Sequence, residues 1–357
     1  MRTPEPAIAR LIEAMPKAEL HLHLDGSVRV ETAMELARTR GIDAPTTWHG
    51  MFDALVAPMP CADQAELLRA FDLPIALMQD AEALERIAAE LVEAKAAEHV
   101  RYVEIRWGPL LHTARGLPLA DGIAAVVRGA ADAATRTGTV VRLIATALRS
   151  HDPADNLRLA EAASGFRDQG LTGWDLAGPE AAYPDPLLHG RAFAAARAGG
   201  LRITVHAGEW GGAAQVRRAL VVEPERIAHG EAASDDPALV AELASRGICL
   251  DLCPTSNVQA GIVPSLAEHA LARLHRAGAP VTLSTDDTTV SDVTLTEEYH
   301  RAIAEIGLTL PELWAIDRFA LDVAFAEDAA LTPLRREFDA WAAAIPELDA
   351  SIPSPAP

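Results

Sequence analysis

Basic residues are scarce in this sequence. Its 357 residues include 31 Lys and Arg against 51 Asp and Glu, which gives a formal net charge of -20. A surface this acidic repels phosphate backbones and anionic lipid headgroups, so a general nucleic-acid-binding protein or a membrane-surface protein is excluded. The composition favours a protein that acts on a small molecule.

Cysteines and long apolar runs are also lacking. None of the three cysteines, Cys61, Cys249 and Cys253, lies in a CxxC pair, which argues against a disulfide scaffold, a zinc knuckle or a redox pair. The first twenty residues do not combine a basic segment with an apolar one, and the chain has no uncharged apolar run of 18 residues. We therefore expect a cytoplasmic protein.

The chain does contain a repeated alternation of short β-rich runs and longer stretches with helical spacing. Eight runs have the composition of strands: 18–24, 100–107, 141–148, 171–178, 202–208, 226–230, 248–253 and 280–287. Several stretches between them begin with Asp, Ser or Pro and end at Gly, as helices do. This alternation predicts an α/β fold, either a closed (β/α)8 TIM-type barrel or an open doubly wound sheet, and the count favours the barrel.

We expect a single domain over residues 1–344. The first two strands are separated by residues 29–99, about 70 residues, which predicts an insertion of two or more helices. This insertion either forms a lid over one end of the barrel or simply packs against it. The segment after residue 292 has the pattern of extra C-terminal helices that finish the barrel. The Pro-rich segment 345–357 is predicted to be a flexible tail.

The first predicted strand carries two histidines in the sequence HLHLD. His21 and His23 are two residues apart, so their imidazoles project from one face of an extended strand. Two nitrogen ligands on one face fit a zinc-type site, although the same spacing also occurs by chance or at satisfied polar positions. A further His at the end of another strand favours the metal.

That further histidine is His206, at the end of the strand TVHAG. Glu209 follows one short turn later, where a carboxylate can act as an acid or base beside a metal site. The alternative for Glu209 is an acid that stabilises the start of the next helix. His229, in RIAHG, is either a buried hydrogen-bonded histidine or a group that orients water, and the convergence of the other histidines favours water orientation.

The eighth predicted strand ends in the adjacent acids Asp286 and Asp287. Two adjacent carboxylates repel each other unless a cation or a hydrogen-bond donor compensates them. A solvated pair in a loop is the simple interpretation. Metal binding by Asp286, with Asp287 turned toward a donor on a ligand, explains the adjacency better.

Other catalytic designs are poorly supported. The sequence has no GxSxG elbow, no GxxxxGK[ST] phosphate loop and no GxGxxG motif. Cys253 stands between an apolar run and a proline, a setting that favours a structural role. A barrel with two metals bridged by a carboxylated lysine is excluded, because Lys17 and Lys95 are the only lysines and both lie ahead of strands.

Taken together, the motifs resemble those of the adenosine deaminase family of the amidohydrolase superfamily. PKAELHLHLDGS, YVEIRW, LAGPE, HAGE, RIAHG, CPTSN and STDD occur in the family's order over residues 16–330. The resemblance implies one zinc ion per chain, held by His21, His23, His206 and Asp286. It further implies that Glu209 donates a proton to N1 of a purine and that His229 orients the attacking water.

The resemblance also implies a set of substrate contacts. Asp287 would lie against N7, the backbone amide of Gly178 would meet N3, and Asp25 would bind the ribose 5′ hydroxyl, with His23 also beside the substrate. Relatives that act on free adenine commonly read HLEG where this chain reads HLDG. Asp25 therefore favours a nucleoside, with adenosine or 2′-deoxyadenosine first.

Several alternatives remain open at this stage. The family commonly has an acidic residue after LAG, whereas this chain has Pro179 followed by Glu180, so the loop after strand four is individual. A 5′-modified adenosine such as aminodeoxyfutalosine, or free adenine, is an alternative substrate. A non-catalytic binding protein and a hydrolase of amides or phosphoesters are competing readings of the fold, and homo-oligomerisation is not decided.

Overall fold

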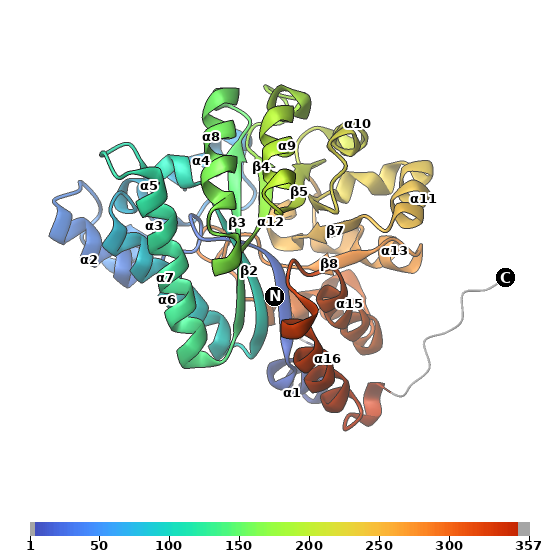
Figure 1. Cartoon of the computed structure of the whole chain (residues 1–357). Helices are drawn as coiled ribbons and strands as arrows, with labels where there is room; N and C mark the ends of the chain where they lie inside the picture. The colour runs from blue at the N-terminus through green and yellow to red at the C-terminus, as the bar shows by residue number, and fades with distance from the viewer. Residues whose placement is uncertain (1–3, 349–357) are drawn as a thin grey trace.

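The computed structural model describes residues 4–348 and shows eight parallel strands wound into a nearly closed barrel, in the order β1 to β8. Figure 1 shows the strands at the centre and the helices around them. The strands are β1 Lys17–His23, β2 Val100–Trp107, β3 Val140–Leu148, β4 Leu171–Ala177, β5 Arg202–Ala207, β6 Arg226–His229, β7 Cys249–Leu252 and β8 Val281–Leu283. The predicted (β/α)8 barrel is confirmed, and each predicted strand matches an observed one.

Helices connect successive strands on the outside of the barrel and complete it after β8. They are α6 Ala81–Ala97, α7 Leu119–Thr137, α8 Pro153–Ser164, α9 Gly190–Ala198, α10 Gly212–Ala219, α11 Pro237–Arg246, α13 Leu271–Arg276, α14 Leu295–Arg301, α15 Leu310–Val323 and α16 Asp328–Ala342. Helix α15 packs against β1 and β8, where the two ends of the sheet meet. An additional helix, α1 (Pro6–Ala14), precedes β1, and α12 (Pro254–Gln259) follows β7.

The long segment between β1 and β2 contains α2 (Val30–Arg40), α3 (Trp48–Leu55), α4 (Gln64–Arg69) and α5 (Asp72–Leu77) before α6. These four helices lie together beside the barrel in Figure 1. Helix α6 packs on α7 and β2, as an ordinary crossover helix does. The additional helices therefore end at Leu77, within the predicted range 29–99. Of the predicted tail 345–357, a 3-10 helix at Pro346–Leu348 is described, and residues 349–357 lie outside the described part.

The barrel closes between β1 and β8 through contacts at the proposed ligands. His23 N–H donates to the carbonyl of Asp286 at 2.7 Å, and Asp286 N–H donates to the carbonyl of His21 at 3.1 Å. The hydroxyl of Ser284 accepts the backbone N–H of His21 at 3.1 Å. The seam that completes the barrel thus also brings residues from its first and last strands to one point.

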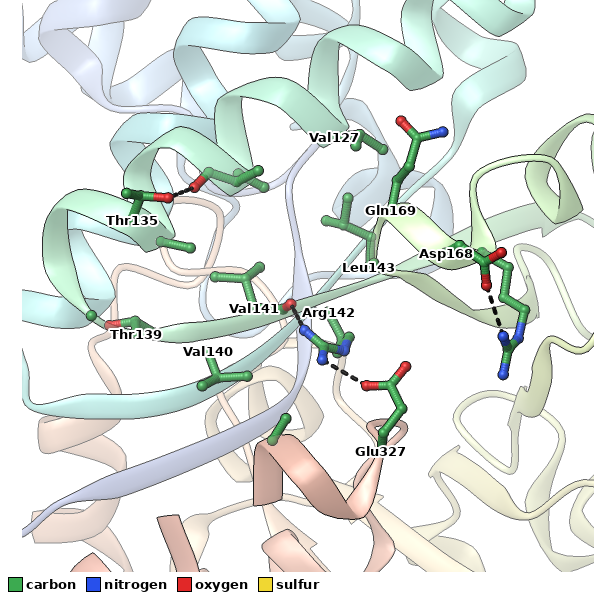
Figure 2. A pocket seen from close by; sticks show the side chains of 17 residues that line it. Val127, Thr135, Thr139, Val140, Val141, Arg142, Leu143, Asp168, Gln169 and Glu327 are labelled. Carbon is green, nitrogen blue, oxygen red and sulfur yellow. Dashed lines mark hydrogen bonds and ion pairs between the residues drawn. The ribbon is translucent and has the colours of Figure 1, made fainter. Parts of the chain in front are cut away.

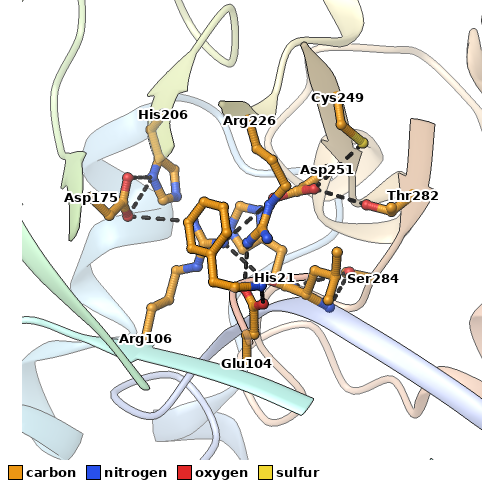
Figure 3. Close-up of polar contacts among 12 residues, drawn as sticks. His21, Glu104, Arg106, Asp175, His206, Arg226, Cys249, Asp251, Thr282 and Ser284 are labelled. Carbon is orange, nitrogen blue, oxygen red and sulfur yellow. Dashed lines mark hydrogen bonds and ion pairs between the residues drawn. The ribbon is translucent and has the colours of Figure 1, made fainter. Parts of the chain in front are cut away.

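The interior of the barrel contains a buried network of charged side chains (Figure 3). The guanidinium of Arg226 contacts the carboxylates of Glu104 and Asp251, the latter at 3.0 Å. Arg106 lies 3.4 Å from Asp175 and donates to the carbonyl of Leu20 at 2.9 Å. Buried charges need partners of this kind, because the interior cannot solvate them.

An open groove of about 700 Å³ lies at the opposite end of the barrel, beside the amino ends of β3 and β4 (Figure 2). Its charged side chains are already paired, Arg142 with Glu327 at 2.7 Å and Arg167 with Asp168 at 2.9 Å. Nothing in this groove resembles a set of converging reactive groups. Among the described residues, no helix combines the length and the apolar character needed to cross a membrane.

Candidate active site

A pocket of about 320 Å³ opens at the carboxyl ends of the strands, where barrel enzymes place their active sites. Its inner wall carries the polar residues that the sequence indicated: His23, Asp25, Gly178, His206, Glu209, His229, Asp286 and Asp287. Its apolar lining includes four residues of α4, α5 and the connection between them: Leu67, Leu68, Phe71 and Ile75. The structure thus brings together, in one pocket, predicted residues from five different strand ends and apolar side chains of the segment between β1 and β2.

Four of these side chains converge on one point. His21, His23, His206 and Asp286 each offer a ligand atom, and the four atoms lie within 4.8 Å of one another. The Nε2 atoms of His23 and His206 are 3.2 Å apart, and Nε2 of His21 is 3.0 Å from Oδ1 of Asp286. Two ligands of a tetrahedral zinc ion, each about 2.0–2.1 Å from the metal, are separated by roughly 3.3 Å. The cluster therefore has the spacing of a single zinc site.

Hydrogen bonds behind the cluster orient its ligand atoms. Nδ1 of His206 donates to Asp175, 2.9 Å from Oδ2, which directs the Nε2 lone pair of the ring toward the other ligands. The hydroxyl of Ser256 donates to Oδ2 of Asp286 at 2.7 Å and leaves Oδ1 facing the histidines. Burial opposes the charge on Asp175, but His206 and Arg106 outweigh it and lower the pKa of this carboxyl. Asp175 is therefore an anion that can accept from His206.

The protonation of the histidines also suits metal binding. Burial lowers the pKa of His23 to about 4 and the pKa of His21 well below its ordinary value. Neutral imidazoles offer lone pairs, which is the form that binds a metal ion. Three imidazole nitrogens and one carboxylate are a donor set that zinc accepts.

Glu209 lies near this cluster as a buried carboxyl with few partners. Burial raises the pKa of Glu209 well above its ordinary value, and the charges of Asp286 and Glu180 add to the effect. This environment therefore favours the protonated form of the side chain. Its Oε2 is 3.8 Å from Nε2 of His229, which is itself 3.8 Å from Asp286. The arrangement places a proton donor and an imidazole on the same side of the candidate metal site.

Asp287 occupies a position that depends on a neighbouring glycine. A Cβ atom on Gly26 would lie 1.8 Å from Oδ1 of Asp287, so the glycine of HLDG is required for this close approach. Burial raises the pKa of Asp287 well above its ordinary value, as does the adjacent charge of Asp286. In its protonated form, which this environment favours, the carboxyl can donate a hydrogen bond into the pocket. Gly178, with a φ of 101°, lines the same pocket.

Asp25 lines the pocket from the end of β1, and neighbouring groups hold its carboxylate in place. Nε2 of His112 donates to Oδ1 at 2.7 Å, and the backbone N–H of Gly108 donates to Oδ2 at 3.0 Å. The position is 4% exposed, so little freedom remains for the side chain. An oriented carboxylate at this wall can accept a hydrogen bond from a ligand hydroxyl.

Sequence reasoning missed the residues that support these groups. Asp175, in the strand LTGWDLAG, could have been found because it is the only acid in an otherwise apolar strand. Glu180 is fully buried, and its Oε2 accepts the N–H groups of Trp210 and Gly211 at 3.0 Å each, directly after Glu209. No local pattern indicated His112, because it contacts Asp25 from a separate connection.

Two site residues have an unusual backbone. His229 and Asp286 adopt positive φ angles of 62° and 68°, which side-chain-bearing residues rarely adopt. Such conformations cost free energy and persist where the surrounding structure imposes them, often at functional sites. Both turn their side chains at the end of a strand toward the same space.

Comparison with known proteins agrees with this geometry. The sequence model of the family described as adenosine deaminase matches residues 16–341. The chain belongs to the adenosine deaminase family. An adenosine deaminase of Vibrio vulnificus is 37% identical over 319 residues, which cover 88% of this chain and 96% of the relative. Family membership makes the chain a hydrolase of C–N bonds on an amidohydrolase fold.

Two solved structures of this family's fold are especially informative. An amidohydrolase from Burkholderia ambifaria with bound zinc superposes with a TM-score of 0.86 at 28% identity, covering 98% of this chain and 96% of that one. The N6-methyl-AMP deaminase of Arabidopsis thaliana superposes with a TM-score of 0.82 at 30% identity, covering 93% and 98%. The four converging ligands of this chain thus fit the single zinc ion expected from the sequence.

Proposed function

We propose that this protein hydrolyses adenosine or 2′-deoxyadenosine to the corresponding 6-oxopurine nucleoside and ammonia. The observation that carries the proposal is the meeting of four metal-ligand atoms with the carboxyl of Glu209, whose pKa is raised by burial, at one pocket. A nucleophile and an acid on one side of a purine ring are what deamination at C6 requires.

His21, His23, His206 and Asp286 would hold the zinc ion. When bound, zinc acts as a Lewis acid that lowers the pKa of a coordinated water to near neutrality. The protein's own groups act on the purine. Glu209 donates its proton to N1, which lets the ring accept electron density as water adds at C6. The water returns one proton to Glu209 and gives the other to the amino group, so that the C6–N bond breaks and ammonia leaves. His229 orients the attacking water.

Three further groups would hold the base and the sugar in register. Asp287, kept neutral by burial, donates to the acceptor N7, and the backbone N–H of Gly178 donates to the acceptor N3. Asp25 accepts from the ribose 5′ hydroxyl, and His112 keeps its carboxylate oriented. When these contacts orient the reacting atoms, less entropy is lost at the transition state, and the activation barrier of the deamination is lower.

The wall of the pocket favours a nucleoside over a nucleotide. Among the described residues that line it, none is Arg or Lys, whereas Asp25, Glu209, Asp286 and Asp287 are acids. A 5′ phosphate would have no cation to bind and would face Asp25. This distinguishes the chain's proposed substrate from that of the N6-methyl-AMP deaminase, whose substrate carries a phosphate.

The apolar residues of α4 and α5 would act as a lid over the bound nucleoside. Leu67, Leu68 and Phe71 cover the opening and would exclude water during the reaction. A 5′-modified adenosine such as aminodeoxyfutalosine, and free adenine, are the alternative substrates. If the lid must open further to admit a larger 5′ group, the enzyme would turn over the 5′-extended substrate more slowly than adenosine.

The test combines metal analysis with a substrate screen. We expect the purified protein to contain one zinc ion per chain and to release ammonia from adenosine and 2′-deoxyadenosine. Adenine, AMP and 5′-extended adenosines serve as comparison substrates in the same spectrophotometric assay. Release of ammonia from none of these compounds by the zinc-loaded protein would contradict the proposed reaction, and a preference for AMP would contradict the argument from the pocket wall.

A further inference from the structure

A line of hydrogen bonds runs from His229 into the protein, away from the pocket. Nδ1 of His229 lies 3.3 Å from Nδ2 of Asn257, and Oδ1 of Asn257 lies 3.0 Å from Nε2 of His269. The backbone N–H of Leu271 donates to Nδ1 of His269 at 3.1 Å. All three side chains are buried, with exposures of 1%, 0% and 3% along the line.

The direction of each hydrogen bond follows from the end of the line that lies farthest from the pocket, at Leu271. A backbone N–H can only donate, so Nδ1 of His269 must be an acceptor. Leu271 is the first residue of α13, where the N–H groups have no partner within the helix and need an acceptor such as this ring. Burial lowers the pKa of His269 to about 3, so the ring is neutral and carries its single proton on Nε2.

That proton sets the orientation of the amide. Because Nε2–H of His269 donates, Asn257 must present its carbonyl oxygen to His269 and its NH2 group to His229. Nδ1 of His229 therefore accepts the hydrogen bond of Asn257 and carries no proton. A neutral imidazole has one proton, and for His229 the remaining position is Nε2.

We propose that Asn257 and His269 are positioning residues that hold His229 in the tautomer with the proton on Nε2, so that His229 donates a hydrogen bond into the active site. The inference rests on the proposed deaminase function and assigns a role to two residues outside the pocket. It makes His229 a donor to the oxygen that adds at C6. In the resting state its Nε2 has no lone pair with which to take a proton from water.

The tautomer can be measured directly. In protein labelled with 15N, the ring nitrogens of a neutral histidine have distinct chemical shifts according to which nitrogen carries the proton. The signals of His229 are assigned by their loss in a His229→Gln variant. We expect the zinc-loaded protein to show a protonated Nε2 and an unprotonated Nδ1 for His229. A protonated Nδ1 would overturn the proposal.

The Asn257→Asp variant tests the functional consequence. A carboxylate of the same shape can only accept, so it would draw the proton of His229 to Nδ1 and leave a lone pair on Nε2. We expect kcat to fall about 100-fold or more, the range of a misplaced proton in general acid–base catalysis, with little change in KM. The 15N signals of His229 should report the change of tautomer in the same variant.

Two substitutions at His269 separate the effect of its hydrogen bond to Asn257 from the effect of its packing. His269→Gln places an NH2 group where Nε2–H lies and should retain most of the activity, whereas His269→Leu removes the donor and frees the amide of Asn257 to turn over. We expect the Gln variant to exceed the Leu variant in kcat by about 10-fold or more. Equal kcat values for the two variants, with the tautomer of His229 unchanged in both, would contradict the proposal that His269 positions His229 through Asn257.

The chain offers a matched control in a second buried Asn–His pair. Nδ2 of Asn156 lies 3.0 Å from Nδ1 of His189, and Nε2 of His189 lies 3.3 Å from the carbonyl of Arg149. We expect Asn156→Asp to lower the melting temperature and leave kcat and the His229 signals unchanged. Absence of deaminase activity in the unmodified protein would instead refute the proposed function, while the 15N measurement would still test the tautomer.

Discussion

Two groups of buried acids in this protein have opposite surroundings. Inside the barrel, Glu104 and Asp251 both contact the guanidinium of Arg226, and Asp175 lies beside Arg106. At the mouth, Asp287 is buried and the side chain of Glu209 is only 13% exposed, yet no Arg or Lys of the described chain forms an ion pair with either. The guanidinium and His206 lower the pKa of Asp175 despite its burial, whereas the pKa values of Glu209 and Asp287 are raised.

The difference explains how one protein assigns the same chemical group to structure and to chemistry. A carboxylate that pairs with a guanidinium links strands across the barrel. At Asp175 the charges of His206 and Arg106 outweigh burial and lower the pKa, whereas at Asp251 burial raises the pKa despite the contact with Arg226. A carboxyl that is buried without a cation becomes protonated and can deliver that proton to a substrate. The partner, and not burial alone, decides which role an acid takes.

The largest effect is expected at the mouth. Glu209→Gln removes the transferable proton but keeps the size of the side chain. We expect kcat to fall by ~10²–10⁴-fold, the usual share of general acid catalysis, with zinc content unchanged. Stability should stay the same or rise, because a buried group without an ionic partner is replaced by a neutral one. Retention of full activity in the purified variant would exclude Glu209 as the proton donor.

The next effect is expected inside the barrel. Arg226→Met would leave the carboxylates of Glu104 and Asp251 buried without their cation. We expect the free energy of unfolding to fall by about 3–5 kcal/mol, measured by chemical denaturation. The double variant that adds Glu104→Gln should recover part of the loss. If Arg226→Met cost less than about 1 kcal/mol, the contrast between the two groups of acids would be wrong.

A third buried acid sharpens the comparison through its pH dependence. Burial raises the pKa of Glu298 from 4.5 to about 7, with the backbone N–H of Thr255 as its partner at 2.9 Å. Because the folded pKa is the higher one, the stabilising contribution is complete below pH 4.5 and is lost as the pH rises through 7. We expect Glu298→Gln to remove roughly 1–3 kcal/mol of this pH dependence.

Unfolding curves at several pH values check this expectation. The stabilities of the variant and the parent protein should agree at low pH, separate as the pH rises from 4.5 to about 7, and differ by a constant amount above that, with the variant more stable. Parallel pH profiles for the two proteins would show that Glu298 does not change its protonation on unfolding.

The smallest effect is expected at an exposed ion pair, which serves as the control for Arg226. Arg128 lies 2.8 Å from Glu85, and both side chains are well exposed. Solvent screens such pairs, so Arg128→Ala should change the free energy of unfolding by less than about 1 kcal/mol. A loss as large as that of Arg226→Met would mean that burial is not what separates the two pairs.

Much of this architecture was predictable because strands and helices leave local patterns. The eight strands followed from β-rich runs between capped helices, and HLHLD, HAGE and the paired acids marked the strand ends. The helical segment after β1 was predicted from its length and its helical spacing. Within it α6 has the same helical spacing as the preceding helices, and only its packing on α7 and β2 identifies it as a crossover.

The supporting residues of the site had no such pattern. Asn257 and His269 reach His229 from a different connection, and Glu180 binds the backbone beyond Glu209 through a contact between two loops. Hydrogen bonds between segments distant in sequence depend on how the chain folds back on itself. Sequence periodicity does not encode them.

The sequence by itself determined the alternation of strands and helices and the residue types available for chemistry, because both depend on the order of side chains along the chain. The tertiary structure decided which carboxyls meet an arginine and which remain alone, and which nitrogen of His229 carries a proton. Those properties depend on solvation and on partners in space. Asp175 and Asp287 are the same residue type, and their neighbours in the folded barrel lower the pKa of the first and raise the pKa of the second.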